Sequence, residues 1–211
     1  FGVRQKEQIR SLKSGINVIS LSATPIPRTL NLSLSKVRDI SLITTPPTGR
    51  KSVKTIVSRY SKSLVFEAIQ REFFRDGQVF YLLNNVSMLE EKKKEISERF
   101  PDKTIAFAHG QLRPKELSKI MQNFIKKEID LLVCTTIIES GIDIENANTL
   151  IVEESENYGL SQLHQIRGRV GRSQREAYAY FLLNETKELK NKASERIEAL
   201  QENESLLSGF S

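Results

Sequence analysis

The sequence predicts an α/β fold of three layers, with a mainly parallel sheet between helices and a helical extension at the C-terminal end. Short apolar, β-branched runs alternate with stretches of helical spacing, and the alternation recurs about four or five times. Runs such as DLLVCTT (130–136) and NTLIVEES (148–155) are apolar at consecutive positions, as is typical of strands buried on both faces. Right-handed crossovers between such strands place helices on both faces of the sheet. We assign this repeat region to residues 46–185.

The N-terminal part of the chain does not fit the repeat. NVISLSAT (17–24) predicts a buried strand that ends in a turn at the prolines of TPIPRT (24–29). TTPPTGRKS (44–52) is rich in proline, glycine and polar residues and is interpreted as a linker. Residues 1–45 supply only about one helix and one strand, so we expect them to be the end of a preceding domain.

The repeat region begins with a helix at SLVFEAIQREFFRDG (63–77), which ends at Gly77, and a strand at QVFYLLNN (78–85). SMLEEKKKEISERFP (87–101) predicts a helix that Ser87 caps and Pro101 stops. The later elements are a strand at 103–110, a helix at 113–129 that starts with Pro114, strands at 130–136 and 148–155, a helix at 159–168 and a strand at 177–183. Residues 186–211 predict a charged helix.

Composition limits the class of protein. The chain has 211 residues, of which 38% are hydrophobic and 27% charged, as in ordinary globular proteins. No apolar run approaches the roughly 20 residues that span a bilayer, and no signal peptide opens the chain. The single cysteine, Cys134, excludes an internal disulfide and predicts a cytoplasmic, reducing compartment; we expect it to be a small buried side chain rather than a metal ligand. The net charge of +6 favours a polyanionic partner.

No phosphate-binding loop is present in the sequence. TGRKS (48–52) has the wrong pattern, because Arg50 interrupts the Gly-Lys pair and Pro46 and Pro47 lack the amide donors that such a loop needs. No paired acidic motif for magnesium is present either. We therefore expect this chain alone not to hydrolyse ATP.

Positive charge is concentrated in QLHQIRGRVGR (162–172), at the end of a predicted helix. Arg167, Arg169 and Arg172 have few acidic neighbours in the sequence, the nearest downstream being Glu176. Because the guanidinium fork donates two parallel hydrogen bonds, two arginines three residues apart are suited to one phosphoryl group. A solvated basic turn is the ordinary alternative.

Polar residues follow several predicted strands, and the carboxyl ends of parallel strands are where ligands bind. Thr135 and Thr136 lead to Gly141 and Asp143, where hydroxyls suit backbone phosphates and a carboxylate suits a ribose. Other strands end at Ser22 and Thr24, at Asn84 and Asn85, and at His109. Taken singly, each of these, like His164, is also explained by a turn, a cap or a satisfied strand end.

Together these segments resemble the second RecA-like (P-loop NTPase-type) motor domain of superfamily 2 helicases and translocases. SATPIPRT (22–29) resembles motif III, LLVCTTIIESGIDI (131–144) motif V and QIRGRVGR (165–172) motif VI, so the resemblance covers nearly the whole chain. FGVRQKEQI (1–9) resembles the residues that follow the acidic box of the first motor domain. GQVFYLLNNV (77–86), REAYAYFLL (175–183) and similar stretches are most like the bacterial transcription-repair coupling factors, with the RecG family as a near relative.

The resemblance implies one lobe of an ATP-dependent double-stranded DNA translocase that displaces stalled RNA polymerase and couples transcription to nucleotide excision repair. ATP with Mg²⁺ would be held mainly by a first lobe outside this chain. RNA polymerase and excision-repair proteins would bind through other domains. The tail 186–211 resembles the start of the helical hairpin with which this group grips DNA.

The resemblance also assigns roles to single residues. Arg169 and Arg172 would be catalytic arginine fingers, and Gly141, Asp143 and Gln165 would lie by the nucleotide. Thr135 and Thr136, with Asn84 and Asn85, would contact the DNA backbone, while Ser22 and Thr24 would couple nucleotide state to DNA grip. No metal ligand is expected.

Two alternatives remain open. One is a RecG-like fork-remodelling lobe, and the other is a non-catalytic nucleic-acid-binding module of the same fold.

Overall fold

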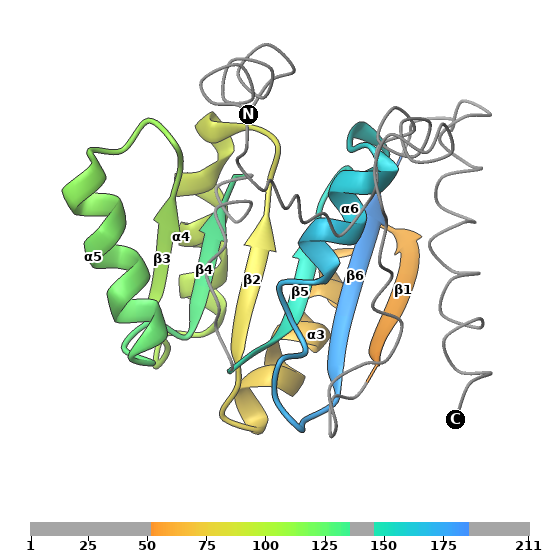
Figure 1. Cartoon of the computed structure of the whole chain (residues 1–211), viewed down its shortest axis with the longest axis horizontal. Helices are drawn as coiled ribbons and strands as arrows, with labels where there is room; N and C mark the ends of the chain where they lie inside the picture. The colour runs from red at the N-terminus through yellow and green to blue at the C-terminus, as the bar shows by residue number, and fades with distance from the viewer. Residues whose placement is uncertain (1–51, 136–145, 186–211) are drawn as a thin grey trace, which may run out of the picture. The chain divides into compact units, whose positions relative to one another are not determined.

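The computed structural model describes residues 52–135 and 146–185, which form a three-layer α/β unit (Figure 1). Its six strands are all parallel and lie in the order β1-β6-β5-β2-β4-β3. The strands are β1 (Val53–Arg59), β2 (Gln78–Leu82), β3 (Ile105–Ala108), β4 (Leu131–Cys134), β5 (Ala147–Val152) and β6 (Ala177–Leu183). The helices are α3 (Lys62–Phe74), α4 (Leu89–Arg99), α5 (Pro114–Ile125) and α6 (Leu160–Arg167), with short 3₁₀ turns η1 (Val86–Met88) and η3 (Ser155–Asn157). The predicted parallel α/β architecture is confirmed.

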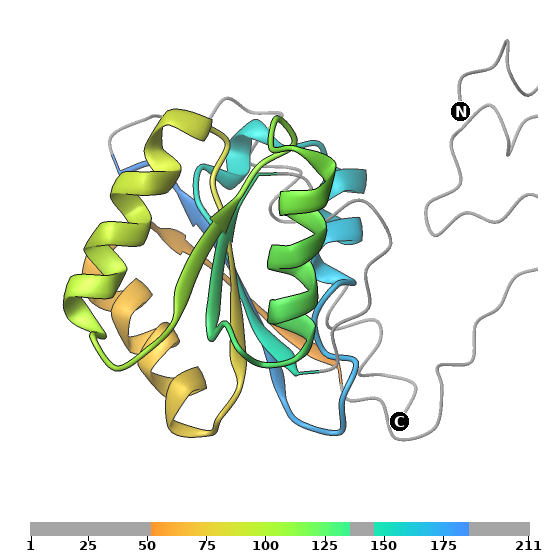
Figure 2. The same ribbon diagram turned by 90° about the vertical axis from the view of Figure 1, so that its left-hand side faces the viewer.

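Helices cover both faces of the sheet: α3 and α4 lie on one side, and α5 and α6 on the other (Figure 2). Alternate strand residues face the two layers, as the pleat requires. In β2, Phe80 and Leu82 pack toward α5 and α6, whereas Val79 and Tyr81 pack toward α3 and α4. Every residue of β2, β4 and β5 is buried, so the predicted two-sided burial of 131–134 and 148–152 is confirmed.

Strand β1 was not predicted. Its sequence, VKTIVSR, mixes polar and apolar residues, because among the described strands β1 lies at the edge of the sheet, next to β6. The register joins Val53 to Ala177 and Arg59 to Leu183, so this pairing connects residues far apart in the chain.

The structure corrects two predicted helix ends. α3 ends three residues before Gly77, and the left-handed residue after it is Asp76, with φ of 54°. Gly77 N and Asp76 N donate to Glu72 O and Phe73 O, the Schellman pattern. Glycine is needed at 77 for a different reason, since an added Cβ would lie 1.6 Å from Glu72 Oε1.

Ser87 does not cap α4, whose N-cap residue is Met88 and has no side-chain hydrogen bond; the capping side chain in this region is Asn85, at the start of the η1 turn before α4. The Asn85 side-chain oxygen accepts hydrogen bonds from Ser87 N (3.0 Å) and Ser87 Oγ (2.8 Å), which begins the η1 turn. Pro114 stands in the first turn of α5, as predicted.

The predicted strand 17–24, the linker and the tail 186–211 lie outside the described residues, and the domain boundaries at 45/46 and 185/186 stay predictions. Within 52–135 and 146–185, no helix is both long and apolar enough to cross a bilayer.

Candidate functional site

Helix α6 leads directly into the arginine-rich segment. Leu163 and Ile166 are buried against the sheet, and Gln162 Oε1 accepts a hydrogen bond from Gly159 N (3.0 Å), which satisfies a free amide at the start of the helix. The helix runs from the carboxyl edge of β5 toward the amino edge of β6, as a crossover must (Figure 1). Residues 168–176, here named the arginine loop, complete that crossover.

The middle of the arginine loop is fixed by packing. Val170 is fully buried in the core under α5 and α6. Gly171 has a φ of 73°, and a Cβ there would lie 2.7 Å from Val53 Cγ2 and 3.0 Å from Ala177 Cβ. The backbone between the two candidate arginine fingers is therefore pressed onto the start of β1 and β6. Arg169 is half-buried and Arg172 is exposed.

Arg167, the first arginine of the run, has a structural role. Its Nη1 donates to Thr55 Oγ1 (3.4 Å) in β1, and its Nη2 lies 3.2 Å from His164 Nδ1. Burial, and then the nearby charge of Arg167, lower the pKa of His164 below its ordinary value. A neutral imidazole with Nδ1 as acceptor suits this contact.

The carboxyl edge of the sheet brings together the predicted DNA-contacting residues that the structure describes. Leu83 N donates to Cys134 O (2.9 Å) and Thr135 N donates to Ala108 O (3.3 Å), so the ends of β2, β4 and β3 are side by side. Asn84 and Asn85 follow β2 and are exposed, and Thr135 follows β4 and is half-buried. The Asn85 oxygen is already engaged as a cap, which leaves its amide hydrogens as donors.

The candidate residues thus form two groups rather than one. Arg169 and Arg172 lie near the amino edge, where Gly171 meets the start of β1 and β6, whereas Asn84, Asn85 and Thr135 lie at the carboxyl edge. Gln165 is exposed on α6, four positions before Arg169. The remaining candidates lie outside the described residues: Ser22, Thr24, Thr136, Gly141 and Asp143.

A buried ionic cluster near the carboxyl edge was missed by the sequence analysis. Lys92 Nζ lies 2.9 Å from Glu153 Oε1 and 3.1 Å from Tyr60 Oη, and Tyr81 donates to the same Glu153 oxygen. Burial alone would lower the pKa of Lys92, but the Glu153 charge and the hydrogen bonds more than offset it and raise that pKa. Burial and the Glu153 carboxylate raise the pKa of Tyr81. The cluster ties β5 to α4.

A second buried carboxylate, Glu72, was also missed. It is fully buried in α3, where it accepts from Arg75 and Thr149. A signal was present in both cases. Glu72 falls on the apolar stripe of α3 (65, 68, 69, 72 and 73), and Lys92 falls between Leu89 and Ile96 on the buried face of α4. A charge at an apolar position of a helix indicates a buried partner.

Cys134 is buried in β4, which confirms the predicted small buried side chain, and this burial raises the pKa of its thiol.

Comparison with known proteins adds a family match. Residues 62–174 match the model of the helicase conserved C-terminal domain. The chain is 51% identical over 210 residues to the transcription-repair-coupling factor of Staphylococcus haemolyticus and 52% identical to that of Staphylococcus epidermidis. Each match covers the whole of this chain and only 18% of the relative, so the chain spans less than a fifth of the relatives' length.

Two solved structures are similar in fold. RecG bound to a three-way DNA junction superposes with a TM-score of 0.71 and 35% identity, over 85% of this chain and 24% of that one. Dbp5 of S. cerevisiae bound to RNA and ADP BeF3 superposes with a TM-score of 0.65, over 92% of this chain and 51% of that one. Because its identity is 13%, the second match supports the fold alone.

Proposed function

Because the chain belongs to the helicase conserved C-terminal domain family, we propose that it is the second motor lobe of an ATP-dependent double-stranded DNA translocase. The observation that carries the proposal is the 51% identity, over 210 residues, to a transcription-repair-coupling factor. The proposed whole enzyme displaces stalled RNA polymerase and couples transcription to nucleotide excision repair. RNA polymerase and excision-repair proteins bind it through domains outside this chain.

The arginine loop fits the phosphates of ATP. Arg169 and Arg172 offer guanidinium forks from a backbone that Val170 and Gly171 hold in place. ATP with Mg²⁺ supplies the free energy of each cycle when bound, and in this proposal another lobe holds most of its phosphates and the metal ion. In the parts of the chain that the structure describes, no group of three His, Cys, Asp or Glu side chains could hold a metal ion.

The residues of this chain then have separate tasks. Arg169 and Arg172 stabilise the charge that develops on the transferred phosphoryl group. Gln165, one helical turn before Arg169, responds to the bound nucleotide. Gly141 and Asp143, which lie outside the described residues, are proposed to lie beside the nucleotide because they belong to the stretch that resembles motif V.

DNA is assigned to the other edge of the sheet. Asn84, Asn85 and Thr135, with Thr136, donate to backbone phosphates and read no base, which suits a motor indifferent to sequence. Ser22 and Thr24 are proposed to couple the two sites.

The arginine assignment is tested by ATP hydrolysis in the full-length protein that contains this chain. Arg169→Ala and Arg172→Ala should each lower DNA-stimulated turnover by about a thousandfold, as loss of an arginine finger does. Arg99→Ala is the control, because it removes the same positive charge from the exposed C-terminal end of α4; its turnover should stay within about twofold of the parent protein. Full activity in both loop variants would contradict the assignment.

The isolated 211-residue chain should not hydrolyse ATP, and measurable turnover would reveal a phosphate site that the proposal lacks. Its DNA affinity should fall steeply as salt rises, because phosphate contacts release counterions. Thr135→Val should weaken the affinity for DNA and leave the affinity for nucleotide unchanged. Salt-independent binding would contradict the backbone contacts.

A second candidate function is fork remodelling, favoured by the 35% identity to RecG bound to a three-way DNA junction. The full-length protein separates the two. The coupling factor should release a stalled transcription complex, whereas a fork remodeller should unwind three-way junctions and leave that complex intact. The predicted cytoplasmic location stays a prediction.

A further inference from the structure

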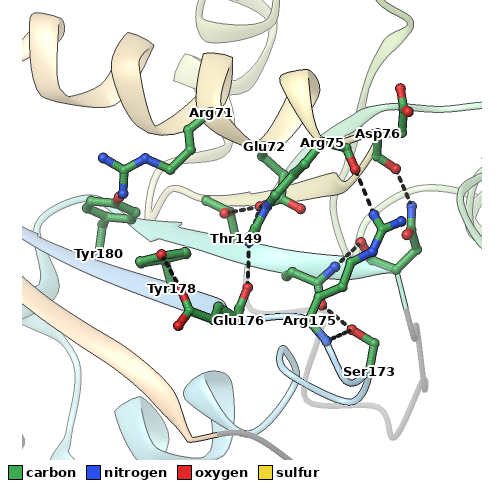
Figure 3. Close-up of polar contacts among 12 residues, drawn as sticks. Arg71, Glu72, Arg75, Asp76, Thr149, Ser173, Arg175, Glu176, Tyr178 and Tyr180 are labelled. Carbon is green, nitrogen blue, oxygen red and sulfur yellow. Dashed lines mark hydrogen bonds and ion pairs between the residues drawn. The ribbon is translucent and has the colours of Figure 1, made fainter.

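The C-terminal end of α3 contacts the arginine loop through a charged pair. Glu72 is fully buried, and its Oε2 accepts hydrogen bonds from Arg75 Nε (3.0 Å), Arg75 Nη2 and Thr149 Oγ1 (Figure 3). A carboxylate buried in this way is stable only while its charged partner is present. The guanidinium of Arg75 is therefore held in one orientation, and it also lies 5.2 Å over the ring of Tyr178.

The orientation of Arg75 directs its remaining nitrogen at the loop. Arg75 Nη1 donates to the backbone oxygen of Glu176 at 2.7 Å. In return, Arg175 Nη1 donates to the backbone oxygen of Arg75, also at 2.7 Å. The C-terminal end of α3 and the arginine loop thus each hold the backbone of the other segment through an arginine side chain (Figure 3). We name this pair of contacts the arginine clamp.

A third anchor stands next to Arg172. Ser173 Oγ donates to Asn148 Oδ1 at 2.7 Å, and Arg175 N donates to Ser173 Oγ at 3.3 Å. On its other side, Arg172 follows Gly171, which is pressed against β1 and β6. The backbone around Arg172 is therefore held on both sides: Gly171 packs against β1 and β6 on the N-terminal side, and on the C-terminal side Ser173 bonds Asn148 and the clamp holds residues 175 and 176.

We propose that the arginine clamp, formed by Arg75 and Arg175 and oriented by the buried Glu72, positions Arg172 for phosphoryl transfer. Arg75 and Arg175 are positioning residues, since they act through the loop backbone. The proposal rests on the proposed function of Arg172. Positioning faults of about 1 Å reduce rates by up to roughly a hundredfold. They act on the transition state, so they lower kcat and leave KM for ATP unchanged.

The test uses the full-length protein and a matched pair of variants. Arg75→Lys keeps the charge but has a single nitrogen. It cannot replace the three guanidinium nitrogens of Arg75, two of which bond Glu72 while the third bonds Glu176 O. Arg71→Lys is the control, because Arg71 lies one turn earlier on α3, stacks on the same Tyr178 ring at 5.3 Å, and contacts Tyr180 instead of the loop. Arg75→Lys should lower kcat of the DNA-stimulated ATPase by roughly tenfold to a hundredfold with KM unchanged. Arg71→Lys should stay within about twofold.

A double variant separates positioning from general destabilisation. If the clamp acts through Arg172, Arg75→Lys should have no further effect in an Arg172→Ala background. Equal loss in both backgrounds, or normal kcat in Arg75→Lys while Arg172→Ala is inactive, would overturn the clamp and leave the proposed function standing. Full activity of Arg172→Ala would instead overturn the finger on which the clamp depends.

Arg175→Ala decides the matter if Arg75→Lys fails to fold. Arg175 is exposed, so its removal should not prevent folding. It breaks the bond to the Arg75 backbone and should lower kcat at unchanged KM. An unchanged kcat would refute the clamp.

Discussion

Adding a single methyl group at Gly171 tests whether the arginine loop is packed tightly against the start of β1 and β6. Its φ of 73° is unfavourable for an alanine by about 1–2 kcal/mol. The new Cβ would lie 2.7 Å from Val53 Cγ2 and 3.0 Å from Ala177 Cβ, and overpacking of this kind costs about 1–3 kcal/mol. The two effects together predict that Gly171→Ala lowers the free energy of unfolding by about 3 kcal/mol.

Urea unfolding of the chain, followed by circular dichroism, measures this loss as a lower midpoint at unchanged slope. Gly110→Ala is the control, because Gly110 is exposed and a Cβ there meets no atom within 4 Å. That variant should lie within about 0.5 kcal/mol of the parent protein. Equal midpoints for the two variants would refute the argument that the loop is pressed against β1 and β6.

Three further predictions concern the core and its charges. Lys92→Met should destabilise by about 3 kcal/mol in urea, because it leaves the Glu153 carboxylate buried without a counter-charge, and adding Glu153→Gln should recover part of the loss. Phe124→Ala should cost about 3–5 kcal/mol of unfolding free energy, since this ring is fully buried, whereas Phe74→Ala, at a ring that is 92% exposed, should change it by less than about 0.5 kcal/mol. The pKa of His164 is below its ordinary 6.5 in the folded protein, so the unfolded chain binds the proton first and stability falls as pH drops below 6.5. His164→Gln should flatten the melting temperature between about pH 7 and pH 5, and an unchanged slope would contradict the lowered pKa.

The two-edge arrangement is consistent with how a motor lobe would work. Arg169 and Arg172 lie near the amino edge of the sheet, and Asn84 and Thr135 at the carboxyl edge. A close-packed sheet moves as one body, so a displacement at one edge reaches the other. In the proposed function, nucleotide and DNA would thus act on opposite edges of the same sheet.

Much of the fold was predictable because its signals are local. Consecutive apolar residues in LLVC indicate burial on both faces, and the bounds of β6 agree with the predicted 177–183. Element ends were less predictable. The side chain that caps the η1 turn before α4 is Asn85 and not the predicted Ser87. Both residue types are good caps, so the path of the chain after β2 decides which of them is used.

The alternation of strands and helices, the family motifs and the concentration of arginines after α6 can be found from the amino-acid sequence alone, because neighbouring residues carry them. The tertiary structure was needed to show that Arg167 contacts Thr55, 112 residues away. It alone paired β1 with β6 and brought Arg75 to the backbone of Glu176, 101 residues further on. Such contacts join segments with no local pattern in common. They exist because packing the sheet brings the end of α3 and the start of β6 to the same edge.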